Sequence, residues 1–228
     1  MQAITLDDIP FQPDLPTLLA SLRLRPGSQR AADLECLAHQ AQAIAKPKAL
    51  YRVAFVDEKG DDFVVIDGAR FQSRILRVNL ESAHRIFAYL ITAGIELDCW
   101  AHSNDDLLHR FWADAIQEQA LFAAHAALQD HLAQTYQPGP LSAMNPGSLE
   151  DWPLDQQPRL FSILGDTGAH IGVRLTGGFL MVPTKSVSGV LFPTEESFQS
   201  CQLCPRENCP GRRAPYDPGL FERKYHLP

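Results

Sequence analysis

The fold is decided by residues 103–136, which read SNDDLLHRFWADAIQEQALFAAHAALQDHLAQTY. The segment is rich in Ala, Leu and Gln, and its apolar residues recur at the spacing of one helix face. Ser103 and Asn104 are good N-terminal caps, and Pro138-Gly139-Pro140 ends the pattern. The sequence therefore predicts a single helix long enough to cross a whole domain.

Short elements of both types precede this helix. Apolar periodicity indicates helices at 15–24 and 34–44, the second of which ends before Pro47. Runs rich in β-branched and aromatic residues, separated by turn sequences, indicate a small group of strands. These strands are predicted at 50–56, 63–66 and 75–78.

Two further elements are predicted directly before the long helix. The apolar residues of 86–91 line one helix face, and Gly94 is a good C-terminal cap for that helix. Residues 95–99 alternate between apolar and polar side chains, which indicates a strand. Beyond the long helix we predict a loop, a helix, the two strands of a hairpin and a last strand, at 141–153, 154–164, 171–175, 179–182 and 187–192.

Composition then divides the chain into two units. Residues 1–195 carry the periodic elements, with a helical and meander part over about 1–80. Residues 196–228 are rich in Cys, Pro and Arg and show no regular pattern. We expect an α+β domain followed by a cysteine-rich, metal-binding tail.

The overall composition is that of a soluble globular protein. Of 228 residues, 45% are hydrophobic and 21% are charged, and the net charge is −7. A chain of this length buries enough apolar surface to fold without disulfides or metal. No apolar run reaches membrane-spanning length, the acidic balance with scattered Lys and Arg argues against a nucleic-acid partner, and we expect a cytoplasmic location.

The sharpest local signal is a cluster of cysteines. Three of the five, Cys201, Cys204 and Cys209, are spaced C-x2-C-x4-C. In a reducing compartment, such a cluster indicates a metal or redox site rather than a disulfide framework. Short-spaced thiolates in loops are typical of iron–sulfur clusters, whereas zinc sites more often have two separated ligand pairs. The pattern favours an iron–sulfur cluster, such as 4Fe-4S, with zinc, redox-active thiols or merely structural thiols as alternatives.

The predicted site lacks a fourth ligand. Three thiolates complete neither a tetrahedral nor a cubane centre. Cys36 and Cys99 lie among apolar residues, where a free cysteine is most often buried, and His226 is a terminal residue. Three nearby arginines would offset the negative charge of a thiolate-bound cluster; they are Arg206, Arg212 and Arg213.

Several motifs together resemble one known family. They are Gly94 to Asp98, the helix Asp105 to Leu132, Asn145-Pro146-Gly147 with Asp151-Trp152-Pro153-Leu154, Ile171-Gly172-Val173 with Leu175-Thr176, and Met181-Val182-Pro183 with Ser186-Val187-Ser188-Gly189. In combination they resemble the activation domain of cobalamin-dependent methionine synthase, and stand-alone relatives of that domain with a Cys-x2-Cys-x4-Cys tail most closely. The resemblance covers about residues 22–192. It implies an α+β fold with a mixed, twisted antiparallel sheet surrounded by helices.

The resemblance also implies a function. In that family the domain docks on a corrinoid protein, or cobalamin-binding domain, whose cobalt has been oxidised, and presents S-adenosylmethionine so that methyl transfer traps the reduced metal. The family motif R-x-x-P-G-Y falls on residues 143–148, where both the arginine and the tyrosine are missing. Their loss argues against tight S-adenosylmethionine binding, because the guanidinium would bind the ligand carboxylate. Asn145, Gly147 and Trp152 are the residues expected to line the inherited pocket.

We therefore hypothesise a corrinoid-binding protein that supports reductive reactivation. In this hypothesis a cluster on Cys201, Cys204 and Cys209 passes an electron to cobalt. The alternative is a non-catalytic docking or scaffold protein with structural zinc on the same cysteines. The residues assign no catalytic group, and a third possibility is that methyl transfer from S-adenosylmethionine persists through changed contacts.

Overall fold

The described residues form a seven-stranded antiparallel sheet with helices packed around it. The computed structural model describes residues 2–195, 198–209 and 212–226. The sheet order is β4-β3-β2-β5-β9-β6, with β1 also paired to β2. The strands are β1 (Ile4–Leu6), β2 (Lys48–Lys59), β3 (Phe63–Ile66), β4 (Ala69–Gln72), β5 (Arg85–Thr92), β6 (Leu141–Met144) and β9 (Ser186–Pro193). This is the predicted α+β fold.

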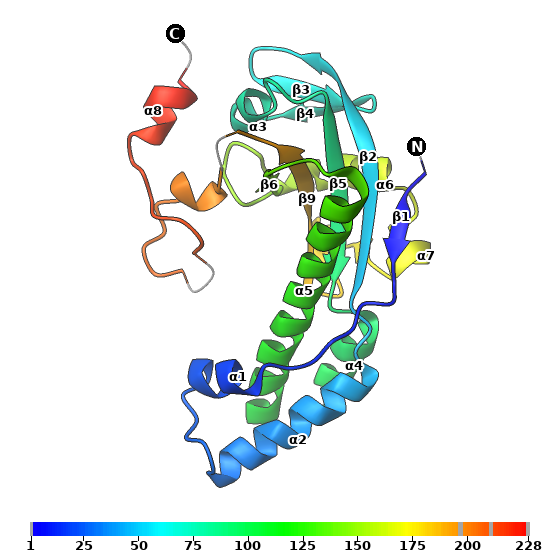
Figure 1. Cartoon of the computed structure of the whole chain (residues 1–228), viewed down its shortest axis with the longest axis vertical. Helices are drawn as coiled ribbons and strands as arrows, with labels where there is room; N and C mark the ends of the chain where they lie inside the picture. The colour runs from blue at the N-terminus through cyan, green and yellow to red at the C-terminus, as the bar shows by residue number, and fades with distance from the viewer. Residues whose placement is uncertain (1, 196–197, 210–211, 227–228) are drawn as a thin grey trace.

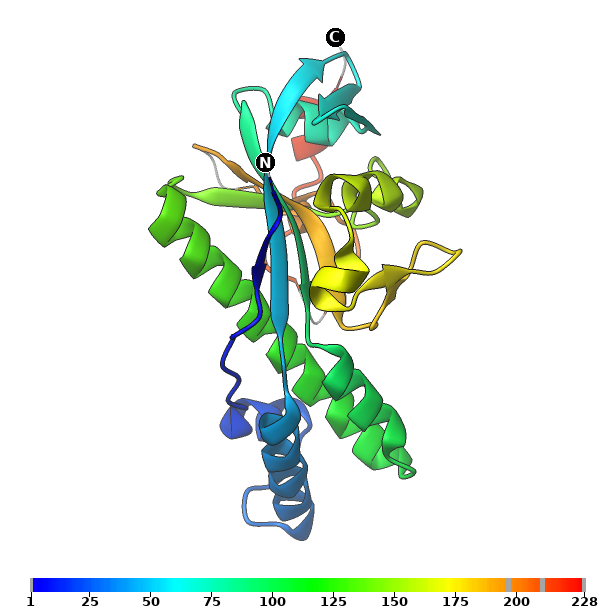
Figure 2. The same cartoon turned by 90° about the vertical axis from the view of Figure 1, so that its right-hand side faces the viewer.

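The helices cover both faces of the sheet and extend beyond one end of it (Figure 1). Helix α5 (Leu107–Tyr136) crosses one face, and α6 (Gln157–Leu164) and α7 (Thr167–Ile171) lie on the other, as Figure 2 shows. The lower part of α5 packs with α1, α2 and α4 in a helical lobe. The remaining helices are α1 (Leu15–Ser21), α2 (Gln29–Ile44), α3 (Arg74–Asn79), α4 (Ile95–Ser103), α8 (Leu220–Lys224), and the short 3-10 turns η1 (Leu154–Gln156) and η2 (Ser200–Gln202).

The long helix confirms the prediction from residues 103–136. It begins after Asp106, whose carboxylate accepts hydrogen bonds from the backbone amides of Leu108 and His109 at 2.7 and 3.0 Å. These bonds satisfy amides that have no partner within the helix. The cap therefore lies slightly downstream of the two residues favoured by the sequence.

The prediction of a helix at 86–91 is wrong, because these residues form the central strand β5. Phe87, Tyr89 and Ile91 face the core under α5, whereas Ile86, Ala88 and Leu90 face the core under α6 and α7. A strand buried on both faces has apolar residues at consecutive positions, so the alternation that identifies a strand disappears.

The strands predicted at 75–78 and 95–99 are helices. The Ser73 hydroxyl caps α3 by accepting a hydrogen bond from the Leu76 amide at 2.9 Å. Helix α4 begins after Gly94, which has a φ of 98° and lies too close to the Lys46 carbonyl for a Cβ. In both cases a short apolar pattern fits either element type, and for α3 the side-chain cap decides between them.

Other predictions near the sheet edge are confirmed or extended. The last strand, predicted at 187–192, is β9. The predicted hairpin is a smaller pair, β7 (Arg174–Leu175) with β8 (Met181–Val182), because the strand predicted at 171–175 starts too early and residue 171 ends α7. The predicted loop 141–153 contains β6, which adds to β9 at the edge. Within the described residues, no helix combines the length and the apolar character that crossing a membrane requires.

Asp151 joins the loop after β6 to α3. Its carboxylate accepts hydrogen bonds from the Ser73 hydroxyl and from the backbone amides of Arg74 and Ile75, the latter two at 3.1 and 3.0 Å. The side chain thus caps a helix from a distant part of the chain. This carboxylate thus links the loop to the N-terminus of the helix.

Asp151→Ala should therefore lower the free energy of unfolding by about 2 kcal/mol, because charged hydrogen bonds to a helix N-terminus are lost. Urea unfolding measures this loss. Asp155→Ala, which removes an exposed carboxylate from the same region, is the control and should change stability little. Equal effects of the two substitutions would contradict the capping role.

Candidate functional site

The tail is anchored at two points, one on strand β6 and one on helix α3. Near its start, the Phe198 amide donates a hydrogen bond to the Ser142 hydroxyl of β6 at 2.8 Å. Near its end, the Tyr225 hydroxyl donates to the side-chain carbonyl of Asn79 at 2.8 Å. Phe198 and Tyr225 are both buried in the core and contact one another edge to face. The cysteine-bearing segment lies between these anchors.

Arg212 organises this segment. Its guanidinium donates hydrogen bonds to the carbonyl oxygens of Cys201, Cys204 and Ala214 at 3.0, 3.1 and 3.2 Å, and to that of Arg206. One side chain therefore gathers several carbonyls of an irregular loop, which is the arrangement that the fork of guanidinium donors allows. The sequence prediction counted Arg212 only as a charge near the thiols.

The three cysteines of the tail are partly buried and form no disulfide. The Arg213 amide donates to the Cys201 sulfur at 3.4 Å. The donor set suits a soft metal, but among the described residues no three His, Cys, Asp or Glu side chains are placed to hold an ion. This arrangement therefore gives no support to an iron–sulfur or zinc centre on Cys201, Cys204 and Cys209, and we derive no electron-transfer step from it.

Cys36 and Cys99 are exposed, so the prediction that they are buried is wrong. Helix α2 buries Leu37 and Ala38 on its inner face and turns Cys36 outward. Because residues 95–99 are helical rather than extended, Leu97 is buried on the inner face of α4 while Cys99 is not.

Asn145 and Gly147 form a tight turn after β6. The Ser148 amide donates to the Asn145 carbonyl at 3.2 Å, and Gly147 has a φ of 80°, as a type II turn requires. The Asn145 carboxamide donates to the Tyr89 hydroxyl at 2.7 Å and to the Ser188 carbonyl at 2.8 Å. The turn is thereby tied to β5 and β9.

Gly189 permits this approach. A Cβ there would lie 2.4 Å from both the side-chain nitrogen of Asn145 and the backbone carbonyl oxygen of Met144. Trp152, in contrast, is fully buried and packs edge to face on Phe71, with ring centroids 5.8 Å apart. Of the three residues predicted to line a pocket, Asn145 bonds to Tyr89, Gly147 shapes the turn, and Trp152 lies in the core.

The α5–tail cleft lies between α5, the sheet and the tail, and has a volume of about 570 Å³. Its floor holds the buried ring of Tyr89, and the tail supplies Arg213 opposite His125 of α5. The other lining residues are Ile91, Glu118, Leu121, Phe122, Lys185, Val187 and Arg212. Asn145 and the tail arginines, far apart in sequence, thus both act on Tyr89, the first through a hydrogen bond and Arg213 through its charge.

Burial and charge set the protonation of this cleft. Burial raises the pKa of Tyr89, while the hydrogen bond from Asn145 and the charge of Arg213 act in the opposite direction. Burial lowers the pKa of His125, and the positive charge of Arg213 lowers it further. The phenol and the imidazole are therefore both neutral near pH 7.

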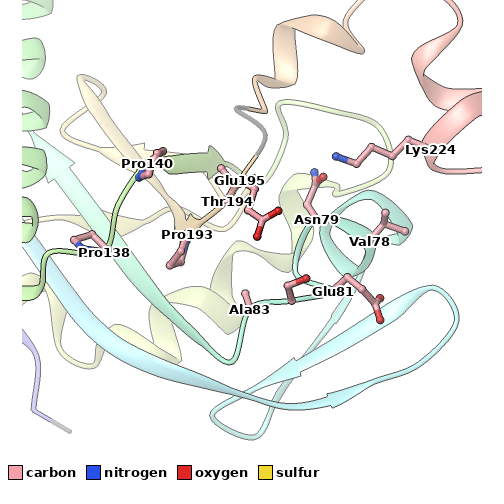
Figure 3. Close-up of a pocket in the computed structure, with 11 residues that line it drawn as sticks. Val78, Asn79, Glu81, Ala83, Pro138, Pro140, Pro193, Thr194, Glu195 and Lys224 are labelled. Carbon is pink, nitrogen blue, oxygen red and sulfur yellow. The ribbon is translucent and has the colours of Figure 1, made fainter.

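Two other clefts border the tail. One, of about 560 Å³, lies between the α3 N-terminus and the tail and includes Asp151, Cys204 and Phe221. The other, of about 530 Å³, lies near α8 where β5 and β6 begin and β9 ends, and Figure 3 shows Lys224 reaching toward Asn79 across it. None of the six sequence-predicted site residues lines this last cleft.

Sequence reasoning missed Tyr89, His125 and Arg213. Tyr89 lies in the segment taken for a helix, and His125 occurs singly on the long helix, with no metal-binding spacing. The only available signal was the basic pair Arg212-Arg213 beside the cysteines, which was assigned to charge balance.

Comparison with known proteins identifies the fold. No protein-family model matches the sequence, and no curated protein matches it. Among solved structures, the chain is similar to the crystal structure of the MetH reactivation domain bound to AdoHcy, with a TM-score of 0.59 and 15% sequence identity. The similarity covers 88% of this chain and 81% of that one. It confirms the expected fold.

Arg212→Ala should loosen the cysteine segment without unfolding the domain. Loss of hydrogen bonds from a charged donor favours local opening by about 1.5–3 kcal/mol, or roughly tenfold to a hundredfold. Thermolysin cleavage within residues 201–214 measures the opening. Arg206→Ala, which keeps the backbone carbonyl that Arg212 contacts, is the control. Equal cleavage of the two variants would contradict the role of Arg212.

The metal centre predicted from the cysteine spacing stays a prediction with a direct test. If the centre exists, anaerobically purified protein should contain iron and sulfide, or stoichiometric zinc. A Cys201→Ser, Cys204→Ser double variant should then lack the metal. Elemental analysis and the visible absorption spectrum report both results. A metal-free protein whose tail thiols all react with a thiol reagent would reject the ligand set.

Proposed function

We propose that this chain is a reactivation-domain-like protein that binds a corrinoid protein, or its corrinoid, and supports reductive reactivation of the cobalt. The observation that carries the proposal is the exposed apolar face of α5 that continues into the α5–tail cleft. The fold similarity supports it, because the neighbour is the reactivation domain of MetH. The proposal assigns this chain a binding role and no catalytic residue.

Large apolar side chains lie along one side of α5. Leu107, Phe111 and Phe122 are 79%, 62% and 61% exposed. Their spacings along the helix place them on one face, together with His125 of the cleft. Exposed aromatic residues that gather on one face mark interaction surfaces, and aromatic side chains dominate the cores of such interfaces. A partner docked on this face would also cover the cleft.

Polar contacts hold this face in place. The Lys185 ammonium, just before β9, pairs with the Asp114 carboxylate of α5 at 2.9 Å. The carboxamide of Gln119 accepts a hydrogen bond from the Asp14 amide at 2.8 Å and so ties α5 to the segment before α1. A preformed face loses less conformational entropy when a partner binds.

S-adenosylmethionine is not part of the proposal. The neighbour was solved with AdoHcy, but the corresponding turn here offers neither a guanidinium nor a phenol. The Asn145 carboxamide, its most polar side chain, already donates to Tyr89 and to the Ser188 carbonyl. Saturable binding of S-adenosylmethionine in calorimetry, lost in Asn145→Ala, would show that the turn still holds a methyl donor.

A second candidate is a docking or scaffold protein without any part in electron transfer. The observation that favours it is that Arg212 and the anchors at Phe198 and Tyr225 hold the described part of the tail by hydrogen bonds within the chain. The two candidates share the docking face and differ in whether the bound chain makes corrinoid reduction faster. The rate of cob(II)alamin reduction by an added reductant, measured on the corrinoid protein with and without this chain, separates them.

Phe122→Ser should weaken binding to a cobalamin-loaded methionine synthase cobalamin domain about tenfold, because a central aromatic contact is lost. Calorimetry with the purified domain measures the affinity. Leu180→Ser is the control, since Leu180 is 60% exposed in the turn between β7 and β8, which lies on the side of the sheet opposite α5 (Figure 2). Equal affinities of the two variants, or no binding by the unmodified chain, would contradict the docking face.

A further inference from the structure

The α5–tail cleft carries an excess of positive charge in an acidic protein. Lys185, Arg212 and Arg213 line it, against one carboxylate from Glu118. The whole chain has a net charge of −7. A cationic cleft on an acidic molecule concentrates anions locally.

Of these cations, Arg213 is the one left available to a ligand. Lys185 is paired with Asp114, and the Arg212 guanidinium is used on backbone carbonyls. Arg213 is exposed, and no ion pair to its guanidinium occurs within the part of the chain that the structure describes. Its backbone amide is fixed on the Cys201 sulfur, which places the side chain at the cleft.

The groups opposite Arg213 suit an anion as well. The Tyr89 oxygen accepts the hydrogen bond from Asn145, so its own proton can be donated elsewhere. His125 is half-buried and neutral, and it offers one donor and one acceptor. An anion held by Arg213 would therefore find a second donor in the phenol or the imidazole.

The walls of the cleft are apolar. Ile91, Leu121 and Val187 line it, and Phe122 stands at it with most of its ring exposed. A small, strongly hydrated inorganic ion leaves such walls unused, whereas an organic anion buries its apolar part against them. A planar carboxylate also matches the two parallel donors of a guanidinium.

We propose that the α5–tail cleft binds an organic carboxylate, with Arg213 of the tail as the group that recognises the carboxylate and the α5 face as the wall for its apolar part. The tail is thus a component of a binding site. The site is a property of the free chain and does not depend on a corrinoid partner, so its test is separate from that of the docking proposal.

Titration calorimetry with three probes tests the site. The probes are 4-phenylbutyrate, its neutral amide 4-phenylbutyramide, and inorganic phosphate. We expect 4-phenylbutyrate to bind at least about tenfold more tightly than either of the others, because only it supplies both a carboxylate for Arg213 and an apolar body for the walls.

Variants then locate the contact. Arg213→Gln should weaken 4-phenylbutyrate binding roughly tenfold to a hundredfold and leave amide binding unchanged, and Arg213→Lys should restore part of the loss. Arg206→Gln is the matched control, because it removes an exposed arginine of the same tail that does not line the cleft. Thermal unfolding confirms that each variant folds.

Three results would overturn the proposal. Equal binding of the carboxylate and the amide would show that no cation recognises the ligand. Phosphate binding as tight as that of the carboxylate would show that the walls contribute nothing. Equal losses of 4-phenylbutyrate affinity in Arg213→Gln and Arg206→Gln would show that the affinity depends on the net charge of the chain rather than on a contact with Arg213.

Discussion

The structure depends on one constraint, the burial of β5 on both faces. Alternate residues of this strand face the core beneath α5 and the core beneath α6 and α7. With β2 on one side and β9 on the other, the strand has no free edge. Between Ile86 and Ile91 the strand therefore carries apolar side chains, with the Tyr89 hydroxyl as the one polar side-chain group.

Tyr89 is the exception that links this core to the surface. Its ring is buried in the strand, while its hydroxyl meets Asn145 from the turn after β6 and lies at the floor of the α5–tail cleft. Gly189 makes the approach of that turn possible. The tail then encloses the cleft, with Arg212 holding its carbonyls and Arg213 facing Tyr89 and His125.

The sequence predicted the elements whose signal is local and long. Helix α5, strand β9 and the Asn145-Pro146-Gly147 turn follow from periodicity, β-branched content and turn chemistry. It failed where tertiary burial overrides the pattern, as in β5, and where a distant cap decides a short helix, as Asp151 does for α3. The tail anchors Phe198 and Tyr225 lie in segments too short for any periodicity. The site was predicted from the spacing of the cysteines, whereas Tyr89, His125 and Arg213 belong to no motif with a recognisable spacing.

The central claim is that the tail is a folded wall of the domain rather than a separate appendage. Hydrogen exchange of the Phe198 amide measures this most directly, because its hydrogen bond to the Ser142 hydroxyl joins the tail to β6 and exists only when the tail is docked. If the tail is a wall, this amide exchanges at least about a hundredfold more slowly than in an unstructured peptide. Exchange at the unstructured rate, while the β5 amides stay protected, would contradict the claim.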